Sequence, residues 1–581
     1  MPGLRRWLVA AVAGSLSLFG LQATAWSAPT RPAVTVSGAI SAAADRFGVP
    51  AQVLTAVCYL EGRFTDHGGA PSVDGGYGCM HLVRNSHADT LDRAAELLGV
   101  PAATVQSDLT SNIAGGAAVL RDEARSLGIT PGGLGDWYAP LAVYSGARTR
   151  SVALTYADSV YQLIRTGISG RAQTGETITV APTAVQPDTS RAATLPAVTA
   201  LPAGCTSDTN VDYPSAVDCI VPTTYDCNVY STCTYAGANR PSDYPINFVT
   251  IHDVEGTGTD AVNVFWDQTS QVSMHYTVDS DGTVYQTLRE HDIAYQNGNY
   301  WYNQRAIGIE NAGYDSTGYQ WYNATEYLSS AKLVAYLLKK YNIPLDHDHV
   351  MSHGTTPPPT TGTSPNHVDP GPYWLWDYYL NLINQQGVAF PTGTGPAGVF
   401  TLSPSTDQQP LGANGTETTD NFNFFYLYTG PSTADPKIPR KGTASDITDV
   451  TDNVEPAISY YYLAHQPDAA GSGMEMYEIW YGEYTGSGWS GTGTLAWLAV
   501  PPSAVVAGRG SVVTLNVSKG KTVNIYGRPD SSRTYITGST PANSQYVSPF
   551  TVVASGVTWY CINYNHRQAW VPASEVSSVL S

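Results

Sequence analysis

The hydrophobic pattern changes several times along the chain, and this change most strongly constrains how the chain can fold. A length of 581 residues predicts roughly three to five units instead of one core. Helical periodicity gives way to an aperiodic stretch rich in Thr, Ala and Pro, then to alternating strands and helices, and finally to Gly-, Ser-, Tyr- and Trp-rich segments. We therefore predict a multidomain protein with a helical unit (36–170), an extended, exposed linker (171–204), an α/β unit with a mixed sheet (206–387) and two small all-β barrels (398–500 and 506–581).

The charge balance excludes some functions. The chain has 29 Lys+Arg against 48 Asp+Glu, a net charge of −19, so nucleic-acid binding through phosphate neutralisation is disfavoured. Hydrophobic residues make up 42% and aromatic residues 11%, which disfavours disorder. Any attachment to an anionic surface has to come from aromatic and hydrogen-bonding groups instead of bulk positive charge.

The N-terminus has the pattern of a secretory signal peptide, for which we predict residues 1–25. A basic segment at Leu4-Arg5-Arg6 precedes a short apolar run from Trp7 to Leu21 and the small residues Ala23-Thr24-Ala25. An uncleaved signal anchor is the alternative. No later stretch reaches about 18 apolar residues, so we expect a secreted, extracellular or cell-wall-associated protein without a membrane segment after cleavage.

Export permits disulfides among the seven cysteines. Their spacing does not fit a cysteine-only metal site. Two pairs enclose short segments, a third pair is conceivable, and one cysteine is left over, although the sequence leaves the connectivity open. These are Cys227 with Cys233, Cys205 with Cys219, Cys58 with Cys79, and Cys561.

Local patterns in the middle unit predict individual elements. Residues 246–252 alternate apolar and polar side chains, as a half-buried strand does. Strands at 274–278 and 283–287 flank a turn at 279–282, and residues 327–341 have apolar residues at helical spacing.

Three segments of the middle unit contain residues that could bind a metal ion. His252 ends a predicted strand, His353 follows the apolar pair Val350-Met351, and Asp369 lies in a Pro- and Gly-containing loop. Two imidazoles and one carboxylate leave a fourth position for water, as catalytic zinc requires, whereas a structural zinc site would need four protein ligands.

These segments resemble the zinc-dependent N-acetylmuramoyl-L-alanine amidases of the phage-lysozyme and peptidoglycan-recognition-protein superfamily over roughly residues 240–385. The motifs occur in the order of that family. They are Ile251-His252, His275-Tyr276, Asp281-Gly282-Thr283-Val284-Tyr285, Ala306-Ile307-Gly308-Ile309-Glu310, Ser352-His353-Gly354 and Asp369-Pro370-Gly371-Pro372.

The resemblance implies a peptidoglycan hydrolase that cleaves the amide between N-acetylmuramic acid and L-alanine. It implies His252, His353 and Asp369 as zinc ligands, Glu310 as the residue that activates water, and His367 as the group that stabilises the oxyanion. Non-catalytic relatives typically lack the third ligand, so the presence of Asp369 favours hydrolysis over a binding-only role. Among the other histidines, we expect His275 to pack in the structure and His347 and His349 to be solvated.

The helical unit contains a candidate general acid. A helix is predicted from Pro50 to Glu61, and Glu61 falls on its apolar face, where burial would raise its pKa. Alternatively, Glu61 reaches solvent or contacts Arg63.

Residues 38–168 resemble the lysozyme-like lytic transglycosylases. The motifs that carry this resemblance are Glu61-Gly62-Arg63-Phe64, Gly76-Tyr77-Gly78-Cys79-Met80-His81-Leu82, Asn112-Ile113-Ala114-Gly115-Gly116-Ala117 and Ala142-Val143-Tyr144-Ser145. Gly62, His81 and Ser145 depart from the usual residues. The resemblance favours a Cys58–Cys79 disulfide and leaves two alternatives, a second, glycan-cleaving activity and a degenerate glycan-binding fold.

The C-terminal segments contain an internal repeat. Met476–Tyr481 matches Trp559–Tyr564 in pattern, and each is followed by an Ala-Trp pair, which predicts two similar barrels. They resemble bacterial SH3 domains, whose aromatic clefts hold cell-wall peptides. The alternative for Trp559 and Trp570 is that both belong to the barrel core. The sequence leaves the oligomeric state open.

Overall fold

The computed structural model describes residues 35–581 with several gaps. The gaps are 63, 65–68, 70–75, 85–88, 147–149, 173, 196–200, 207–209, 316–317, 319–320, 360–366, 405–422, 439–452, 483–491 and 517–521. The expected signal peptide and Arg63 lie outside the described residues. In the part that is described, no helix has the length and apolar character needed to cross a membrane.

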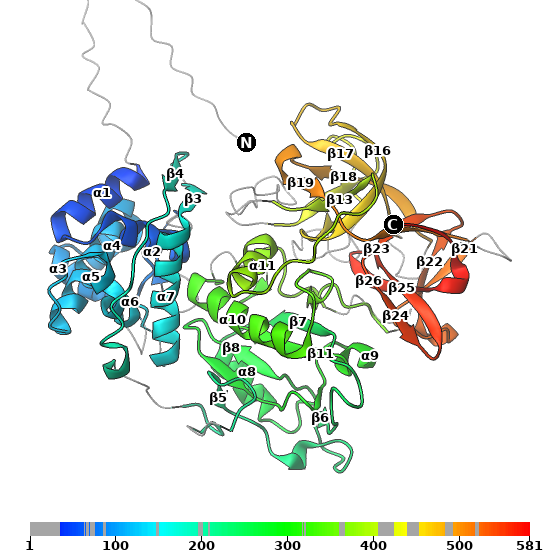
Figure 1. Cartoon of the computed structure of the whole chain (residues 1–581), viewed down its shortest axis with the longest axis horizontal. Helices are drawn as coiled ribbons and strands as arrows, with labels where there is room; N and C mark the ends of the chain where they lie inside the picture. The colour runs from blue at the N-terminus through cyan, green and yellow to red at the C-terminus, as the bar shows by residue number, and fades with distance from the viewer. Residues whose placement is uncertain are drawn as a thin grey trace, which may run out of the picture.

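The N-terminal unit is helical, as predicted (Figure 1). Its central helix α5 packs against α1, α3, α4 and α6. Side chains of Thr35, Asp89 and Asp108 cap the starts of α1, α3 and α5, which explains where these helices begin. The elements are α1 (Val36–Phe47), α2 (Ala51–Gly62), β1 (Gly76–Tyr77), β2 (Leu82–Val83), α3 (Thr90–Leu98), α4 (Ala102–Ser107), α5 (Leu109–Ser126), α6 (Tyr138–Tyr144) and α7 (Arg150–Thr166).

The segment expected as an exposed linker is partly folded onto this unit. Strands β3 (Ile168–Arg171) and β4 (Thr177–Val180) form a hairpin, and Ile178 and Leu195 are buried in the helical core. The Arg150 guanidinium donates to the carbonyl of Leu195 at 2.7 Å. The expectation of an exposed chain is therefore wrong for these residues, because isolated apolar side chains find a hydrophobic surface beside them.

The middle unit contains a mixed six-stranded sheet in the order β12-β7-β11-β8-β9-β5. Strands β12, β7, β11 and β8 are parallel, and β8 and β9 form the predicted antiparallel hairpin. The predicted helix is α10 (Ala324–Tyr341). The other elements are β5 (Val217–Asp218), β6 (Tyr235–Ala236), β7 (Phe248–Asp253), α8 (Gly258–Phe265), β8 (Tyr276–Val278), β9 (Val284–Gln286), β10 (Ile293–Ala294), α9 (Tyr300–Asn303), β11 (Ala306–Asn311), β12 (Val350–Ser352) and α11 (Trp376–Gln385).

Strand β7 is buried on both faces, so the prediction of a half-buried strand is wrong. Val249 and Ile251 pack with residues of α10 and α11 on one face. On the other face, Met274 and Gln296 approach Gly308 of the neighbouring strand β11 so closely that they leave no room for a Cβ atom there. A central parallel strand covered on both sides explains this burial.

The C-terminal third is all-β, as predicted, and lies beside the middle unit (Figure 1). One antiparallel sheet has the order β15-β14-β18-β17-β16-β13-β19, and two further sheets have the orders β23-β20-β27 and β22-β21-β26-β25-β24. The two halves of the repeat lie in β17 and β25, which pair with β18 and β26. The SH3 and lysozyme-like assignments stay predictions.

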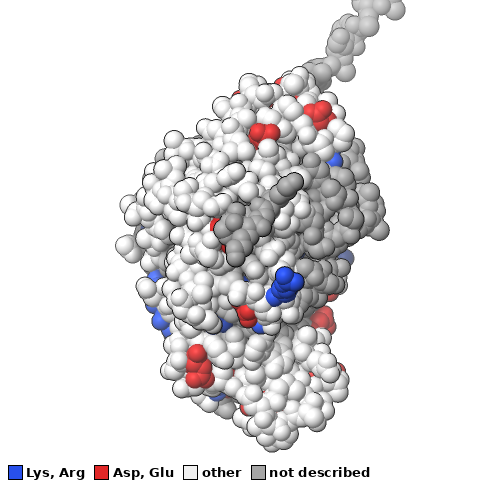
Figure 2. All heavy atoms as spheres, turned by 90° about the vertical axis from the view of Figure 1, so that its right-hand side faces the viewer, with Lys and Arg blue, Asp and Glu red and all other residues white. Residues whose placement is uncertain are grey.

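The strands of the first β unit are β13 (Val399–Leu402), β14 (Phe425–Tyr428), β15 (Asn453–Val454), β16 (Ser459–Pro467), β17 (Glu475–Gly482), β18 (Thr494–Val500) and β19 (Val505–Ala507). Those of the second are β20 (Ser511–Leu515), β21 (Thr522–Tyr526), β22 (Ile536–Pro541), β23 (Gln545–Ser548), β24 (Thr551–Ala554), β25 (Val557–Tyr564), β26 (Arg567–Pro572) and β27 (Val576–Leu580). Figure 2 shows that the charged side chains among the described residues are scattered over the face that includes these units, where they form no patch of one sign.

All three cysteine pairings that the sequence suggested are formed as disulfides, and Cys561 is a buried free thiol. The prediction that Trp559 and Trp570 are core residues is confirmed by their burial.

Candidate active site

The parallel strands bring three of the predicted site residues together. His252 and Glu310 lie side by side in register near the carboxyl ends of β7 and β11, and His353 directly follows the neighbouring strand β12. Carboxyl ends of parallel strands meet at one edge of a sheet, which is where ligands bind in open α/β sheets.

Asp369 reaches the same edge from a loop. The Gly354 amide donates to the Asp369 carbonyl at 2.9 Å, and the Tyr322 hydroxyl lies 2.7 Å from both the Pro370 carbonyl and an Asp253 carboxylate oxygen. Gly371 has a φ of 77°, and a Cβ there would lie 2.9 Å from the Cβ of Asp315, so the loop requires glycine at this point.

His252, His353 and Asp369 form a compact group of possible metal ligands within the described residues. Their ligand atoms all lie within 4.8 Å of one another, and all three residues are buried. The Nδ1 atoms of His252 and His353 are each 3.2 Å from an Asp369 carboxylate oxygen. Tetrahedral zinc with bonds of about 2.0–2.2 Å holds neighbouring ligand atoms roughly 3.3–3.6 Å apart, so the two distances from histidine to carboxylate are compatible with zinc.

The protonation states also suit metal binding. Burial lowers the pKa of His353 to about 4 despite the nearby Asp369 carboxylate, so its imidazole is neutral at pH 7. Burial alone would raise the pKa of Asp369, but the interactions with His353, His252 and His367 hold it well below its usual range. Neutral imidazoles and an ionised carboxylate are the forms that bind a metal.

Glu310 is the acidic group beside these ligands. Burial and the nearby Asp369 carboxylate raise its pKa well above the ordinary value, and its Oε2 atom has no hydrogen-bond partner among the described residues. A carboxyl group with a raised pKa and an unpaired oxygen, on a residue that lines a cavity, can accept and return a proton.

His367 lies at the solvent side of the group. Its side chain is 62% exposed, its ring stacks on that of His353 at 4.2 Å, and its Nδ1 is 3.2 Å from Asp369. The hydrogen bond to Asp369 raises the pKa of His367, which favours its cationic, donating form.

These residues line a cavity of about 450 Å³. The lining includes the histidines and carboxylates described above. It also includes a set of mostly apolar residues, here called the apolar wall, which are Val264, Phe265, Val272, Met274 and Tyr295. The cavity therefore offers both proton-transfer and metal-binding groups and an apolar contact surface.

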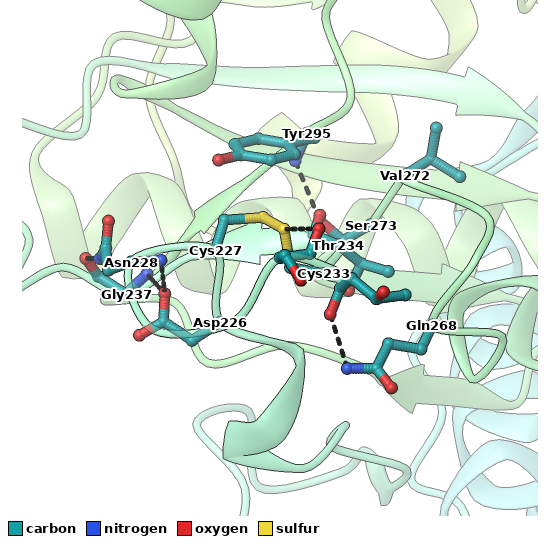
Figure 3. The surroundings of a disulfide bond; sticks show 12 residues. Asp226, Cys227, Asn228, Cys233, Thr234, Gly237, Gln268, Val272, Ser273 and Tyr295 are labelled. Carbon is teal, nitrogen blue, oxygen red and sulfur yellow. Dashed lines mark hydrogen bonds between the residues drawn. A yellow bond between two sulfur atoms is a disulfide. The ribbon is translucent and has the colours of Figure 1, made fainter.

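The Cys227–Cys233 disulfide supports the apolar wall (Figure 3). The Ser273 hydroxyl donates to the Thr234 carbonyl at 2.7 Å, and the Tyr295 amide donates to the Ser273 hydroxyl at 2.9 Å. Thr234, which directly follows the loop closed by the disulfide, is thus hydrogen-bonded to Ser273, and Ser273 to Tyr295; both of these residues line the cavity.

Replacing Cys227 and Cys233 by serine is expected to lower the free energy of unfolding by about 2 kcal/mol, because the disulfide closes a short loop in the unfolded chain. If the cavity binds a substrate, we also expect a higher KM with little change in kcat, since the altered lining lies outside the group of possible metal ligands. Urea unfolding and initial rates measure both effects. The double variant Cys205→Ser with Cys219→Ser is the control, because it removes a disulfide of the same unit without changing the hydrogen bonds at Ser273. Equal KM values in both double variants would contradict a role in the cavity wall.

Glu61 lies apart from this cavity, in the helical unit. Its side chain is 5% exposed and its Oε2 is 3.6 Å from Nδ1 of His81, which confirms the predicted burial and excludes the alternative of a solvated helix end. Its charge raises the pKa values of the buried Tyr144 and Tyr156, in each case after the larger effect of burial.

Of the predictions for the remaining histidines, one is confirmed and two are wrong. His275 is fully buried and accepts from the Gly308 amide at 3.1 Å, so its predicted packing role is confirmed. The prediction that His347 and His349 are solvated is wrong. His347 is 1% exposed and lies 2.7 Å from Glu455, and His349 pairs with Asp346 at 2.7 Å. The C-terminal β unit covers His347, which the local sequence does not indicate.

Sequence reasoning also missed the support of the Asp369 loop. Tyr322 contacts this loop and Asp253 contacts Tyr322, and the only signal available was that Asp253 directly follows the candidate ligand His252.

Residues 242–372 match the family model of N-acetylmuramoyl-L-alanine amidases. A curated relative, N-acetylmuramoyl-L-alanine amidase A of Achromobacter lyticus, is 28% identical over 177 residues, which are 28% of this chain and 93% of that protein. The predicted resemblance to this family is confirmed for the middle unit.

Some solved structures also match a part of the chain. The selenomethionine AmpD derivative is 21% identical, with a TM-score of 0.23, and the match covers 29% of this chain and 96% of that one. N-acetylmuramoyl-L-alanine amidase LysC from Clostridium intestinale is 19% identical, with a TM-score of 0.21, and the match covers 30% of this chain and 98% of that one.

Proposed function

We propose that this chain is a secreted, zinc-dependent N-acetylmuramoyl-L-alanine amidase that cleaves the bond between N-acetylmuramic acid and the L-alanine of the peptidoglycan stem peptide. The observation that carries the proposal is the convergence of His252, His353 and Asp369 beside Glu310 in a cavity of the matched segment. A cell-wall substrate requires action outside the cytoplasm, in agreement with the predicted signal peptide.

His252, His353 and Asp369 would hold the metal. Zinc at such a site lowers the pKa of water and polarises an amide carbonyl. Glu310 accepts the proton of the attacking water and returns one to the leaving amine, a role that its raised pKa and unpaired oxygen support.

His367 stabilises the negative charge that develops on the carbonyl oxygen. Its exposed position at the cavity and its raised pKa support this donor role. The apolar wall formed by Val264, Phe265 and Val272 contacts the part of the substrate beyond the scissile amide.

Digestion of purified peptidoglycan, followed by mass spectrometry, tests this proposal. The zinc-loaded protein is expected to release stem peptides with a free L-alanine amine. Removal of the metal with a chelator should abolish this product, and added zinc should restore it. Absence of the product with zinc-loaded protein would overturn the proposal and leave a peptidoglycan-binding role as the alternative.

A second candidate activity rests on Glu61. A buried carboxyl group beside His81 is an environment that favours a general acid for glycan cleavage. The same digestion would then yield new reducing or anhydromuramic ends that disappear in the Glu61→Gln variant and persist after chelation. If the amount of these glycan ends is the same with and without the protein, the helical unit has a binding or structural role and no glycan-cleaving activity.

A further inference from the structure

The C-terminal β units share hydrophobic cores with the middle unit. Trp570 and Trp559 of the second β unit belong to one buried cluster with Phe248, Trp301 and Tyr302, and the rings of Trp301 and Trp570 are 5.2 Å apart. Tyr373, which follows the Asp369 loop, packs in another cluster with Phe424, Tyr426 and Met476 of the first β unit. Units that bury their aromatic residues against one another are not freely tethered modules.

A buried carboxylate joins these units. Glu455 of the first β unit is 2% exposed, and one of its oxygens lies 2.7 Å from Nε2 of His347 in the middle unit. Its other oxygen lies 3.1 Å from Nε2 of His566 in the second β unit and accepts a 2.7 Å hydrogen bond from the Ser352 hydroxyl. The two histidines hold the pKa of Glu455 at about 2 against the effect of burial, so it is ionised.

Ser352 connects Glu455 to the turn that carries His353. The Thr355 amide donates to the Ser352 hydroxyl oxygen at 2.9 Å, and that hydroxyl donates its own proton to Glu455. The Thr356 amide donates to the His353 carbonyl at 2.9 Å. Because an ionised carboxylate can only accept hydrogen bonds, Glu455 orients the O–H bond of Ser352 toward itself. The lone pairs of the Ser352 oxygen then accept the hydrogen bond from the Thr355 amide in the turn.

Other residues of the β units brace the same segments. The Gln568 amide donates to the Thr355 carbonyl at 2.9 Å, and the Asn423 amide donates to the Pro372 carbonyl at 2.7 Å. The Arg567 guanidinium is 3.5 Å from the His367 carbonyl. Two of the three ligand-bearing segments of the middle unit, those of His353 and Asp369, therefore rest on residues that follow this unit in the chain.

We propose that Glu455 is a positioning residue that fixes the metal ligand His353 through Ser352, so that the β units are part of the catalytic unit. A metal site loses affinity when the groups that orient its ligands are removed, typically by about 10–100-fold. The part of this proposal that concerns turnover rests on the proposed amidase function, whereas the part that concerns metal affinity does not.

The test compares two serine variants of the full chain. Ser352→Ala removes the link to the His353 turn but leaves Glu455 paired with both histidines. Ser403→Ala is the matched control, because the Ser403 hydroxyl donates to Asp377 at 2.8 Å across the interface between the same units, away from the ligand segments. Zinc affinity is measured by competition with a chromophoric chelator, and kcat and KM are measured with saturating zinc.

We expect Ser352→Ala to bind zinc at least about tenfold more weakly and to have a lower kcat with little change in KM, while Ser403→Ala matches the wild type. Ser352→Thr, which keeps the hydroxyl, should restore zinc affinity. Equal zinc affinity in Ser352→Ala and Ser403→Ala would overturn the proposal.

If Ser352→Ala does not fold, Ser352→Val gives the decision. Valine has the size of the threonine in Ser352→Thr but cannot donate to Glu455, so its zinc affinity should fall below that of Ser403→Ala, and an unchanged affinity overturns the proposal. A wild type that binds zinc but releases no stem peptide would contradict the proposed function and leave this comparison valid.

Discussion

Glu310→Gln is expected to lower kcat for stem-peptide release by about 10²–10⁴-fold, since general acid–base catalysis contributes about that much. This equals about 3–5 kcal/mol of transition-state stabilisation. Glutamine keeps the size of the side chain but cannot accept the proton of the attacking water. Zinc affinity should change little, because the group of possible ligands consists of His252, His353 and Asp369.

Initial rates on a soluble muropeptide with saturating zinc measure this effect. Glu478→Gln is the control, because Glu478 is also a half-buried glutamate of a strand but lies in the first β unit, outside the cavity. A Glu310→Gln variant that keeps more than a tenth of the wild-type kcat would show that another group carries the proton.

Glu455→Gln is expected to lower the free energy of unfolding by about 3–5 kcal/mol, the usual cost of removing one partner from a buried ion pair. The substitution leaves His347 and His566, both about 1% exposed, without the carboxylate that they contact. The shift in the pKa of Glu455 from 4.5 to about 2 corresponds to a similar value, about 3 kcal/mol.

The pH dependence has a defined sign. The folded pKa of Glu455 lies below the unfolded value, so its stabilisation is complete above pH 4.5 and is lost as the pH falls toward 2. The difference between the wild type and Glu455→Gln in urea unfolding should therefore be large at pH 7 and shrink by pH 3.

Glu475→Gln is the control for this measurement. Glu475 also pairs with a histidine, His465, at 3.1 Å in the same β unit, but both side chains are partly exposed. Exposed pairs contribute about 0–1 kcal/mol, so its effect should be small. A Glu455→Gln variant that unfolds at the same urea concentration as Glu475→Gln would contradict the role of the buried carboxylate.

The structure changes one expectation about the C-terminal units. Their aromatic residues Trp559 and Trp570 were candidates for the core or for a cleft that holds cell-wall peptides, and the structure places both in a core shared with the middle unit. Any contact of these units with the cell wall has to involve side chains other than Trp559 and Trp570.

The sequence was sufficient wherever the determining interactions are local. Helix α2 and the hairpin of β8 and β9 follow from periodicity and turn residues, and spacing suggested the short-range disulfides without fixing their connectivity. The candidate ligands His252 and His353 could also be recognised from the sequence, because each falls at a predictable strand end.

Only the tertiary structure decided the features that depend on partners distant in sequence. Both faces of β7 are covered by other elements, Ile178 and Leu195 fold back onto the helical unit, and Glu455 meets His347 across 108 residues of chain. The residues around His347 resemble an ordinary polar loop, because burial is imposed by the unit that docks on them. The sequence therefore identified the candidate catalytic groups, and the docking of the β units decides which distant residues contact the segments that carry them, because those contacts depend on packing between units.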